Sequence, residues 1–364
     1  MHILQIIHDR ECGSVQKLAG IIEHGLRPHR VVVETVHLYP RAGLPIHQKL
    51  RYAQRLARRI RRGGFDALIA YRSTASILAC IAAWLVGCRI RIVQQTCMPG
   101  ATARLPRLTD KIVGTLGVYS ANIVNSVAAW SEFSGYPARY RRAMILIEPG
   151  LDPPAPGRSR AETRRRFALP ASPPILLNVG RLAEQKNQDL LIRALACLPQ
   201  AHLVLAGTGP EKAALHELAV TLGVDERLHM LGALPADEIA DLYAAADLFV
   251  FPSAAETFGL AAVEAATAGL PIVAADLPVL REMLRGDGTQ PVAFVKSDDV
   301  EGWIAAIGRA LAMPVARSAF AAALGRKYSR QRMIESYLSL FDGGRPRART
   351  PLHGLTPAAE KART

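Results

Sequence analysis

The chain has 364 residues, half of them hydrophobic, and a formal net charge of +14. This length suffices for two domains of ordinary size rather than one. Its five cysteines are odd in number and scattered, which excludes a disulfide framework and favours a reducing cytoplasm. Residues 1–150 carry 21 Lys and Arg against 8 Asp and Glu, whereas residues 151–364 carry 24 against 23. The first half is therefore expected to meet something anionic, and the second half need not.

The beginning of the chain is predicted to be a strand, His2 to Asp9, and not a signal peptide, because its apolar run is short and no basic leader precedes it. Further strands are predicted over residues 31–38, 65–71 and 89–96, with helices between them. This alternation favours a doubly wound, Rossmann-like α/β domain. Gly13 stands in the turn after the first strand, where a phosphate loop would lie, but the absence of G-x-G-x-x-G disfavours a dinucleotide oxidoreductase.

A helix predicted over residues 47–62 combines one apolar stripe with a basic remainder that contains no acid. Such a face is drawn to anionic lipid headgroups, so we predict contact with an anionic membrane surface. A solvated surface helix is the alternative. Nucleic acid is disfavoured as a partner, because aromatic residues are few and are not interleaved with the arginines. The basic side chains of this helix include Lys49, Arg51, Arg55, Arg58, Arg59 and Arg62.

The turn at Gly150 and the Pro-rich run PPAPG that follows it mark a linker between two domains. A buried strand then leads to Gly180, Arg181 and Lys186, and a second strand leads to a turn at Gly209. Fixed cations at the carboxyl end of a strand suit a departing diphosphate, because the leaving oxygen gains negative charge as its bond breaks. Arginine can bind it bidentately and lysine as a point charge.

The stretch from Asp247 to Asp276 has the pattern of a strand, a loop, a helix and a second strand. A crossover of this kind places Glu256 at the carboxyl edge of a parallel sheet, where ligands of open α/β folds bind. The helix that starts near Gly259 directs free N–H groups to the same edge, which suits a diphosphate. Glu264 follows on this helix, and acids in so apolar a run are more often functional or paired than simply solvated.

The run PSAAETFGLAAVEAATAGLPIVAAD resembles the signature of the retaining, GT-B-fold glycosyltransferases of family 4. In that signature Pro-Ser, two glutamates separated by seven residues, Phe-Gly and Gly-x-Pro occur in this order. The family's Gly-Arg-Leu and its following lysine are matched by Gly180, Arg181 and Lys186. The resemblance covers about residues 2–340 and is strongest from 175 to 285.

The resemblance implies an α/β fold in which two doubly wound, Rossmann-like domains face each other across a cleft. The last helix would return to the first domain and would be followed by a mobile tail. The implied ranges are 1–151 for the acceptor-side domain, 152–325 for the nucleotide-sugar domain, 326–341 for the last helix and 342–364 for the tail.

The resemblance also implies metal-independent transfer of a sugar, with retention, from a UDP- or GDP-sugar to a lipid-linked or glycan acceptor. No cofactor is expected, and the sequence has no Asp-x-Asp. Arg181 and Lys186 would hold the diphosphate, Glu256 the donor-sugar hydroxyls and Glu264 the ribose hydroxyls. The remaining candidates for donor binding are Gly13, Gly180, Gly209, Phe258, Gly259 and Leu260.

Gln95, Thr96 and Cys97 stand where many family members have a histidine that helps to orient the transferred sugar. Two alternatives therefore stay open. One is a nucleotide-sugar 2-epimerase of the same fold, and the other is a non-catalytic nucleotide-sugar-binding protein. We expect a cytoplasmic protein of glycan biosynthesis, peripheral on the inner face of the cell membrane.

Overall fold

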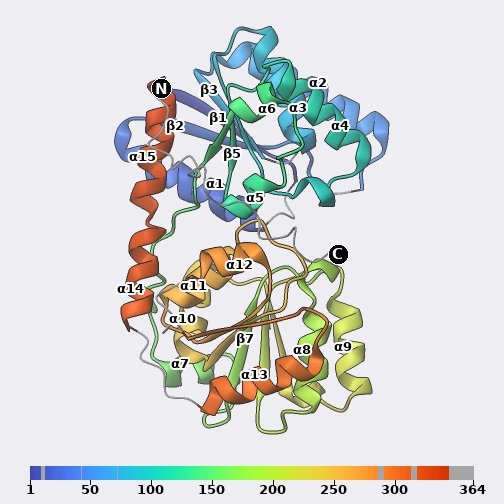
Figure 1. Ribbon diagram of the computed structural model, residues 1–364, viewed down its shortest axis with the longest axis vertical. Helices are drawn as coiled ribbons and strands as arrows, with labels where there is room; N and C mark the ends of the chain where they lie inside the picture. Colours follow the sequence, from blue (N-terminus) through green and yellow to red (C-terminus); the bar gives the residue numbers. More distant parts are fainter. Residues whose placement is uncertain (10–12, 42, 72, 286–290, 313–317, 344–364) are drawn as a thin grey trace, which may run out of the picture. The chain divides into compact units, whose positions relative to one another are not determined.

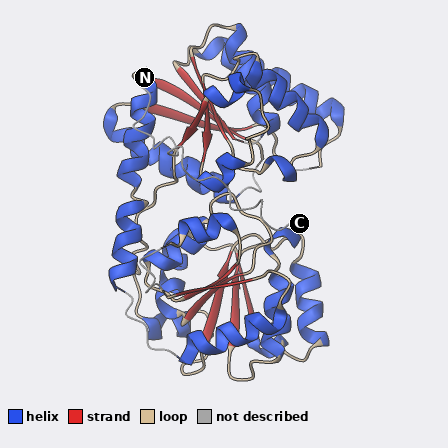
Figure 2. Cartoon of the chain, viewed as in Figure 1, coloured by secondary structure: helices blue, strands red, loops and turns tan. Residues whose placement is uncertain are grey.

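The computed structural model describes residues 1–9, 13–41, 43–71, 73–285, 291–312 and 318–343. The chain divides into two compact units, Met1–Pro149 together with the segment from Gln331 on, and Gly150–Arg330. Each unit is a parallel sheet with helices on both faces (Figures 1 and 2). The division at Pro149 lies two residues before the predicted one. From residue 344 on, the predicted tail lies outside the described residues.

The first unit has six parallel strands in the order β2-β1-β3-β4-β5-β6. The central strands form where short apolar runs are buried on both faces, as parallel sheets require; β3, for example, is buried at every residue. The predicted strands are confirmed, with ends one to two residues shorter. Their bounds are β1 His2–Ile7, β2 Val32–His37, β3 Ala67–Tyr71, β4 Ile90–Gln94, β5 Ala121–Val124 and β6 Met144–Leu146.

Helices of the first unit cover the sheet from both sides. One side carries α1 (Gly13–Leu26) and α15 (Arg330–Phe341), whose buried residues share a core with β1, β3 and β4. The other side carries the remaining helices, which share a second core with the same sheet. They are α2 Ile46–Gly63, α3 Ser73–Leu85, α4 Arg104–Thr115, α5 Val127–Ser131 and α6 Ala138–Arg142.

The last helix begins at Arg330 and not at residue 326 as predicted. Residues 326 and 327 instead end α14 (Ser318–Lys327), because the two residues between the helices pair with Leu151: the Leu151 N–H donates to the Tyr328 carbonyl at 2.8 Å. In the first unit, the Tyr337 hydroxyl donates to Gln94 Oε1 at 2.5 Å. This buried hydrogen bond fixes α15 to the end of β4.

The second unit repeats the plan with the order β12-β11-β10-β7-β8-β9, again all parallel. Its strands are β7 Ile175–Val179, β8 His202–Ala206, β9 Leu228–Gly232, β10 Leu248–Phe251, β11 Ile272–Ala275 and β12 Val292–Val295. Its helices are α7 Arg160–Arg166, α8 Gln188–Ala196, α9 Lys212–Thr221, α10 Ala236–Ala245, α11 Leu260–Thr267, α12 Pro278–Met283, α13 Val300–Ala312 and α14.

The order of this second sheet has one switch point. From β7 the chain moves to β8 and β9 on one side and then returns to place β10 on the other side of β7. The loops that leave β7 and β10 therefore diverge from neighbouring strand ends. In open α/β sheets, ligands bind in the crevice that such a divergence leaves at the carboxyl edge.

Candidate functional site

Two loops meet at the switch point of the second sheet. The loop after β7 contains Gly180, Arg181 and a short 3₁₀ helix, Glu184–Lys186, and the loop after β10 contains Glu256. They are joined in both directions: Gln185 Nε2 donates to the Ala255 carbonyl at 2.7 Å, and the Ala254 N–H donates to the Gln185 carbonyl at 2.9 Å. The fold thus brings a predicted cation and a predicted acid from separate loops to one place.

Lys186 and Glu256 form an ion pair between these loops, Nζ to Oε1. The Glu256 side chain is only 10% exposed and that of Lys186 23%, so both charges are held in a partly dry environment. Lys186 Nζ also lies 5.3 Å from the centre of the Phe251 ring, over its face. The ammonium group is therefore already oriented before any ligand arrives, as electrostatic stabilisation of a leaving group requires.

The glycine turn after β8 supports this arrangement through its backbone. A Cβ on Gly207 would lie 1.8 Å from the Gly180 carbonyl oxygen, and one on Gly209 would lie 2.0 Å from that of Leu182. The Leu182 N–H donates to the Thr208 carbonyl at 2.9 Å, so the two loops pack backbone to backbone. Gly209 is predicted from the sequence as a ligand contact; in the structure it packs against the Leu182 backbone.

Helix α11 starts directly after the Glu256 loop. Its N-cap, Gly259, has φ +86°, a left-handed conformation that a side chain would strain, and Leu260 opens the helix. The first N–H groups of a helix have no partner within it, so α11 presents donors at this edge. The Phe258 side chain points into the core instead, 3% exposed, with its ring 5.3 Å from that of Tyr328.

Glu264 lies in the second turn of α11 and is buried. The Tyr243 hydroxyl, from α10, donates to Glu264 Oε2 at 3.2 Å. Burial, followed by the nearby Glu264 carboxylate, raises the pKa of Tyr243 well above its usual value, so the hydroxyl keeps its proton. Sequence reasoning missed Tyr243, because a tyrosine in an amphipathic helix looks like an ordinary core residue.

Two further polar residues at these loops were also missed. Ser253 Oγ and Gln188 Oε1 are buried and have no hydrogen-bond partner within the described part of the chain. A buried polar atom in this condition calls for a water molecule or a ligand group. Gln188 does donate, through Nε2, to the Arg181 carbonyl at 3.0 Å, which holds the loop that carries Arg181. The Arg181 residue itself is exposed.

Gly13 is the remaining predicted donor contact, and it belongs to the first unit. It is the first residue of α1 and is exposed, and a Cβ there would meet nothing within 4 Å. The predicted phosphate turn before it falls partly on residues 10–12, outside the described residues.

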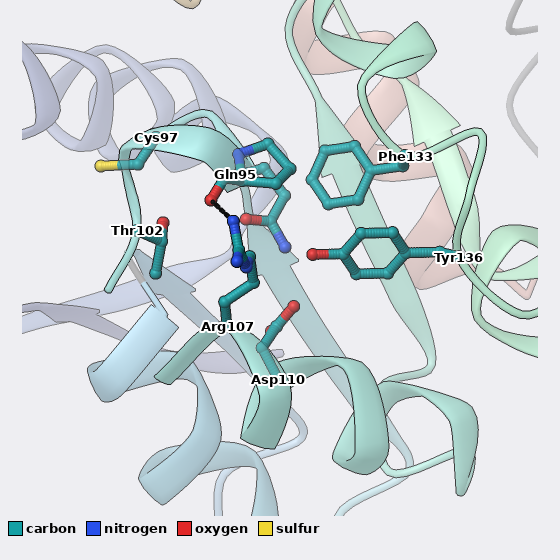
Figure 3. Close-up of a pocket in the computed structure, with 8 residues that line it drawn as sticks. Gln95, Cys97, Thr102, Arg107, Asp110, Phe133 and Tyr136 are labelled. Carbon is teal, nitrogen blue, oxygen red and sulfur yellow. Dashed lines mark hydrogen bonds between the residues drawn. The ribbon is translucent and has the colours of Figure 1, made fainter. Parts of the chain in front are cut away.

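Gln95, Thr96 and Cys97 follow β4 in the first unit. Gln95 Nε2 donates to the Tyr140 hydroxyl at 3.2 Å, and Tyr140 donates to buried Asp110 at 2.6 Å. Burial raises the pKa of Asp110, while its hydrogen bonds from two tyrosines oppose that shift. Figure 3 shows the small pocket beside this network, with Gln95, Cys97 and Tyr136 around it.

The predicted basic helix is confirmed as α2, and it is exposed along most of its length. Only Leu56 and Ile60 are fully buried. Arg59 forms an ion pair with Glu34 of β2, and Arg55 lies over the Tyr52 ring at 5.6 Å.

None of the described helices is both long and apolar enough to span a bilayer. Across the described ranges, no three His, Cys, Asp or Glu residues gather as a metal site would require.

Residues 159–327, most of the second unit, match the protein family described as Glycosyl transferases group 1. D-inositol 3-phosphate glycosyltransferase 1 of Catenulispora acidiphila is 34% identical over 281 residues, covering 70% of this chain and 66% of that protein. The D-inositol 3-phosphate glycosyltransferase of Mycobacteroides abscessus is 34% identical over 229 residues, covering 60% and 50%. The chain thus spans between half and two thirds of the length of these relatives.

Solved structures with the same fold cover nearly the whole chain. HepE of Anabaena, in complex with UDP and glucose, superposes with a TM-score of 0.77 at 19% identity, over 93% of this chain and 99% of that one. Sucrose-phosphate synthase of Thermosynechococcus elongatus superposes with a TM-score of 0.74 at 19% identity, over 94% and 98%. The predicted fold of two Rossmann-like domains, GT-B, is therefore confirmed.

Proposed function

We propose that this chain, whose residues 159–327 form a glycosyl transferases group 1 domain, transfers a sugar from a nucleotide-diphosphate donor to a lipid-linked or glycan acceptor. The observation that carries the proposal is the meeting of Lys186 and Glu256 at the switch point, directly before the N-terminus of α11. A cation, an acid and a row of backbone donors at one strand edge fit a sugar diphosphate.

In this proposal the second unit binds the donor. Lys186 and Arg181 neutralise the diphosphate, and the backbone from Phe258 to Leu260 contributes N–H donors. Gly180 and Gly209 let the loops approach closely, and Gly13 of the first unit is a further donor contact. UDP is the first nucleotide to test, because HepE, which has the same fold, holds UDP and glucose; GDP is the alternative base.

Two acids are proposed to bind the hydroxyl groups of the ribose and of the donor sugar. Glu264 accepts from the vicinal ribose hydroxyls with the carboxylate oxygens that Tyr243 helps to orient. Glu256 accepts from donor-sugar hydroxyls, and each charge-assisted hydrogen bond is expected to contribute about 1.5–3 kcal/mol. Binding of the donor brings its phosphates to Lys186, so the ammonium group then contacts both Glu256 and the departing diphosphate.

The proposed reaction retains the anomeric configuration and belongs to a retaining glycosyltransferase of family 4. The bond between the anomeric carbon and the diphosphate oxygen breaks, and its electron pair stays on the diphosphate. The acceptor hydroxyl attacks the same face of the sugar, and its proton passes to the departing phosphate. Lys186 and Arg181 stabilise the charge that builds up there, and we propose that they do so in place of a metal ion.

The acceptor is proposed to be anionic or lipid-linked, since residues 1–150 carry nearly all of the excess positive charge. The curated relatives, named for D-inositol 3-phosphate, are consistent with an anionic acceptor. We place the reaction in the cytoplasm at the inner face of the cell membrane, where α2 would meet anionic lipid, and in glycan biosynthesis.

A thermal-shift series with UDP, GDP and ADP, and with their sugars, tests donor binding. A ligand at 100 times its dissociation constant adds about 2.7 kcal/mol of stability, and we expect one nucleotide to raise Tm in the wild type and much less in Lys186→Ala. No response to any nucleotide diphosphate would contradict the proposal. Incubation with the donor alone separates the alternatives: epimerised sugar would indicate a 2-epimerase, and binding without transfer to any acceptor would indicate a binding protein.

A further inference from the structure

Exposed apolar side chains gather on one helical layer of the first unit. The described residues include 13 large hydrophobic side chains that are exposed, and nine of them lie on or directly after α2, α3 and α4. Only two, Val220 and Leu222, belong to the second unit. Scattered exposed leucines are ordinary, but a concentration of this kind on one layer marks an interaction surface.

Four of the nine form a stripe along α4. Leu105, Leu108, Ile112 and Leu116 are 74%, 55%, 50% and 64% exposed. Their spacing of three, four and four residues places them on one side of the helix. The opposite side faces the core through Asp110, Val113 and Gly114. The stripe is therefore an outward face of α4 in addition to its buried one.

The neighbouring helices expose apolar side chains as well. α3 packs against both α2 and α4, and Figure 1 shows the three helices together on one side of the sheet. The sequence of α3, STASILACIAAWL, contains no charged residue, and its end exposes Trp84, Leu85 and Val86. At the start of α2, Ile46 and Leu50 are exposed as well. We call these nine residues the apolar face.

Exposed arginines lie on α2 and on α6 of the same unit. On α2, Arg51, Arg55, Arg58 and Arg62 are exposed, and α6, which packs against α4, exposes Arg139, Arg141 and Arg142. Residues 46–142 contain 16 Lys and Arg against three acids. One of these acids, Asp110, is buried and accepts hydrogen bonds from Tyr119 and Tyr140. The net charge of +13 over this segment equals that of the whole first half.

We propose that the apolar face inserts into the surface of an anionic bilayer, with the arginines around it bound to lipid phosphates. Amphipathic surfaces of this kind bury their apolar side chains at the boundary between headgroups and acyl chains, and tryptophan favours that depth. A second copy of the chain is a poorer occupant, because pairing two such faces would bring two strongly positive rims together. This inference deepens the membrane contact of the proposed function and moves its centre from α2 to α4.

Co-sedimentation with vesicles of phosphatidylglycerol and phosphatidylcholine, at low and high salt, tests the apolar and the electrostatic contributions to membrane binding separately. We expect the fourfold variant L105Q/L108Q/I112Q/L116Q to bind about tenfold or more weakly at both salt concentrations, because it removes the inserted side chains. Reversing Arg51, Arg55 and Arg58 to Glu should abolish mainly the part of binding that salt screens. The matched control is V220Q/L222Q, which changes the exposed apolar side chains of the second unit and should bind as the wild type does.

Trp84 offers an independent readout, because it is 54% exposed whereas Trp303 is fully buried. Anionic vesicles should shift its emission to shorter wavelengths, and the shift should be absent in Trp84→Phe. Wild-type vesicle binding by the fourfold variant, with its Tm unchanged, would overturn the inference. So would a wild-type dimer that this variant dissociates and that ignores vesicles, since the face would then join two copies.

The test is independent of the donor site. Stabilisation by nucleotide diphosphates depends on the second unit, and the fourfold variant should retain it fully. If the wild type fails to bind vesicles but is still stabilised by a nucleotide diphosphate, only the membrane inference is wrong. If it binds vesicles but no nucleotide diphosphate stabilises it, only the donor assignment is wrong.

Discussion

The two units have closely similar sheets and use them differently. In the second unit the candidate site lies at the carboxyl edge, where loops bonded to one another bring Lys186 and Glu256 together next to the start of α11. In the first unit the most unusual feature lies away from the strand ends, on the outer surface of α2, α3 and α4. One sheet thus carries a polar candidate site at its carboxyl edge, and the helices of the other expose apolar and basic side chains.

Charge shows the same contrast. Several arginines of the second unit are paired with acids: Arg164 meets Asp247 at 2.7 Å, and Arg158 meets buried Asp241 at 2.6 Å. Burial alone would raise the pKa of Asp241, but its hydrogen bonds from Arg158 and Gly157 outweigh that effect and lower it. The α2 helix, by contrast, contains many arginines and no acidic residue. Paired charges stabilise a fold, whereas an excess of one sign creates a field that attracts a partner. The difference suggests that one unit recognises a small molecule and the other a surface.

The largest effect is expected from Lys186→Ala. The change removes the cation that we propose to bind the diphosphate, and it leaves the partly buried Glu256 without its ion-pair partner. Loss of one charge-assisted contact of about 1.5–3 kcal/mol corresponds to roughly 10- to 150-fold in kcat/KM for the donor. Steady-state transfer kinetics measure it, with Lys212→Ala, an exposed lysine at the start of α9, as control. If both variants have the same kcat/KM for the donor, Lys186 does not take part in donor binding or transfer.

A smaller effect is expected from Gly209→Ala, which tests whether the loops of the second unit are held by backbone contact. The new methyl group would stand 2.0 Å from the Leu182 carbonyl oxygen, so one loop must move. We expect a destabilisation of about 2 kcal/mol, or roughly 4–8 °C in Tm, together with weaker nucleotide binding. Gly308→Ala in α13 is the control, because a Cβ there meets nothing within 4 Å. An unchanged Tm for Gly209→Ala would mean that the loop accommodates the methyl group.

The fold was largely predictable because its signals are local. Apolar runs such as ILLNV and LFVF mark buried strands. Gly259 and Gly269, both with positive φ, precede and follow α11 as the sequence indicated. The start of the last helix was not predictable, since Tyr328 and Ser329 leave the helical path only to bond with Leu151, far away in the sequence.

The candidate site was predictable in part. The cation and the acid after β7 and β10 follow from topology, because parallel strands end at one edge. The contacts that hold these loops and Glu264 do not follow: Gln185 bonds to Ala255, 70 residues away in the chain, and Tyr243 bonds to Glu264, 21 residues away. The apolar face was missed for a different reason. Leu105, Leu108 and Ile112 have helical spacing, and such spacing alone cannot tell a face that is buried by the protein from one that is left outside.

The smallest effect is expected from Tyr243→Phe. The variant keeps the ring in the core and removes only the hydroxyl that orients Glu264, a hydrogen bond of about 1 kcal/mol, so nucleoside diphosphate binding should weaken by roughly fivefold. Because burial raises the pKa of Tyr243, its hydroxyl is protonated at pH 6.5 and still at pH 9, and the ratio of wild-type to variant affinity should be the same at both. Isothermal titration at the two pH values measures this, with Tyr52→Phe on α2 as the control. A ratio that falls to one at pH 9 would show that the tyrosine ionises, and that the donor to Glu264 lies elsewhere.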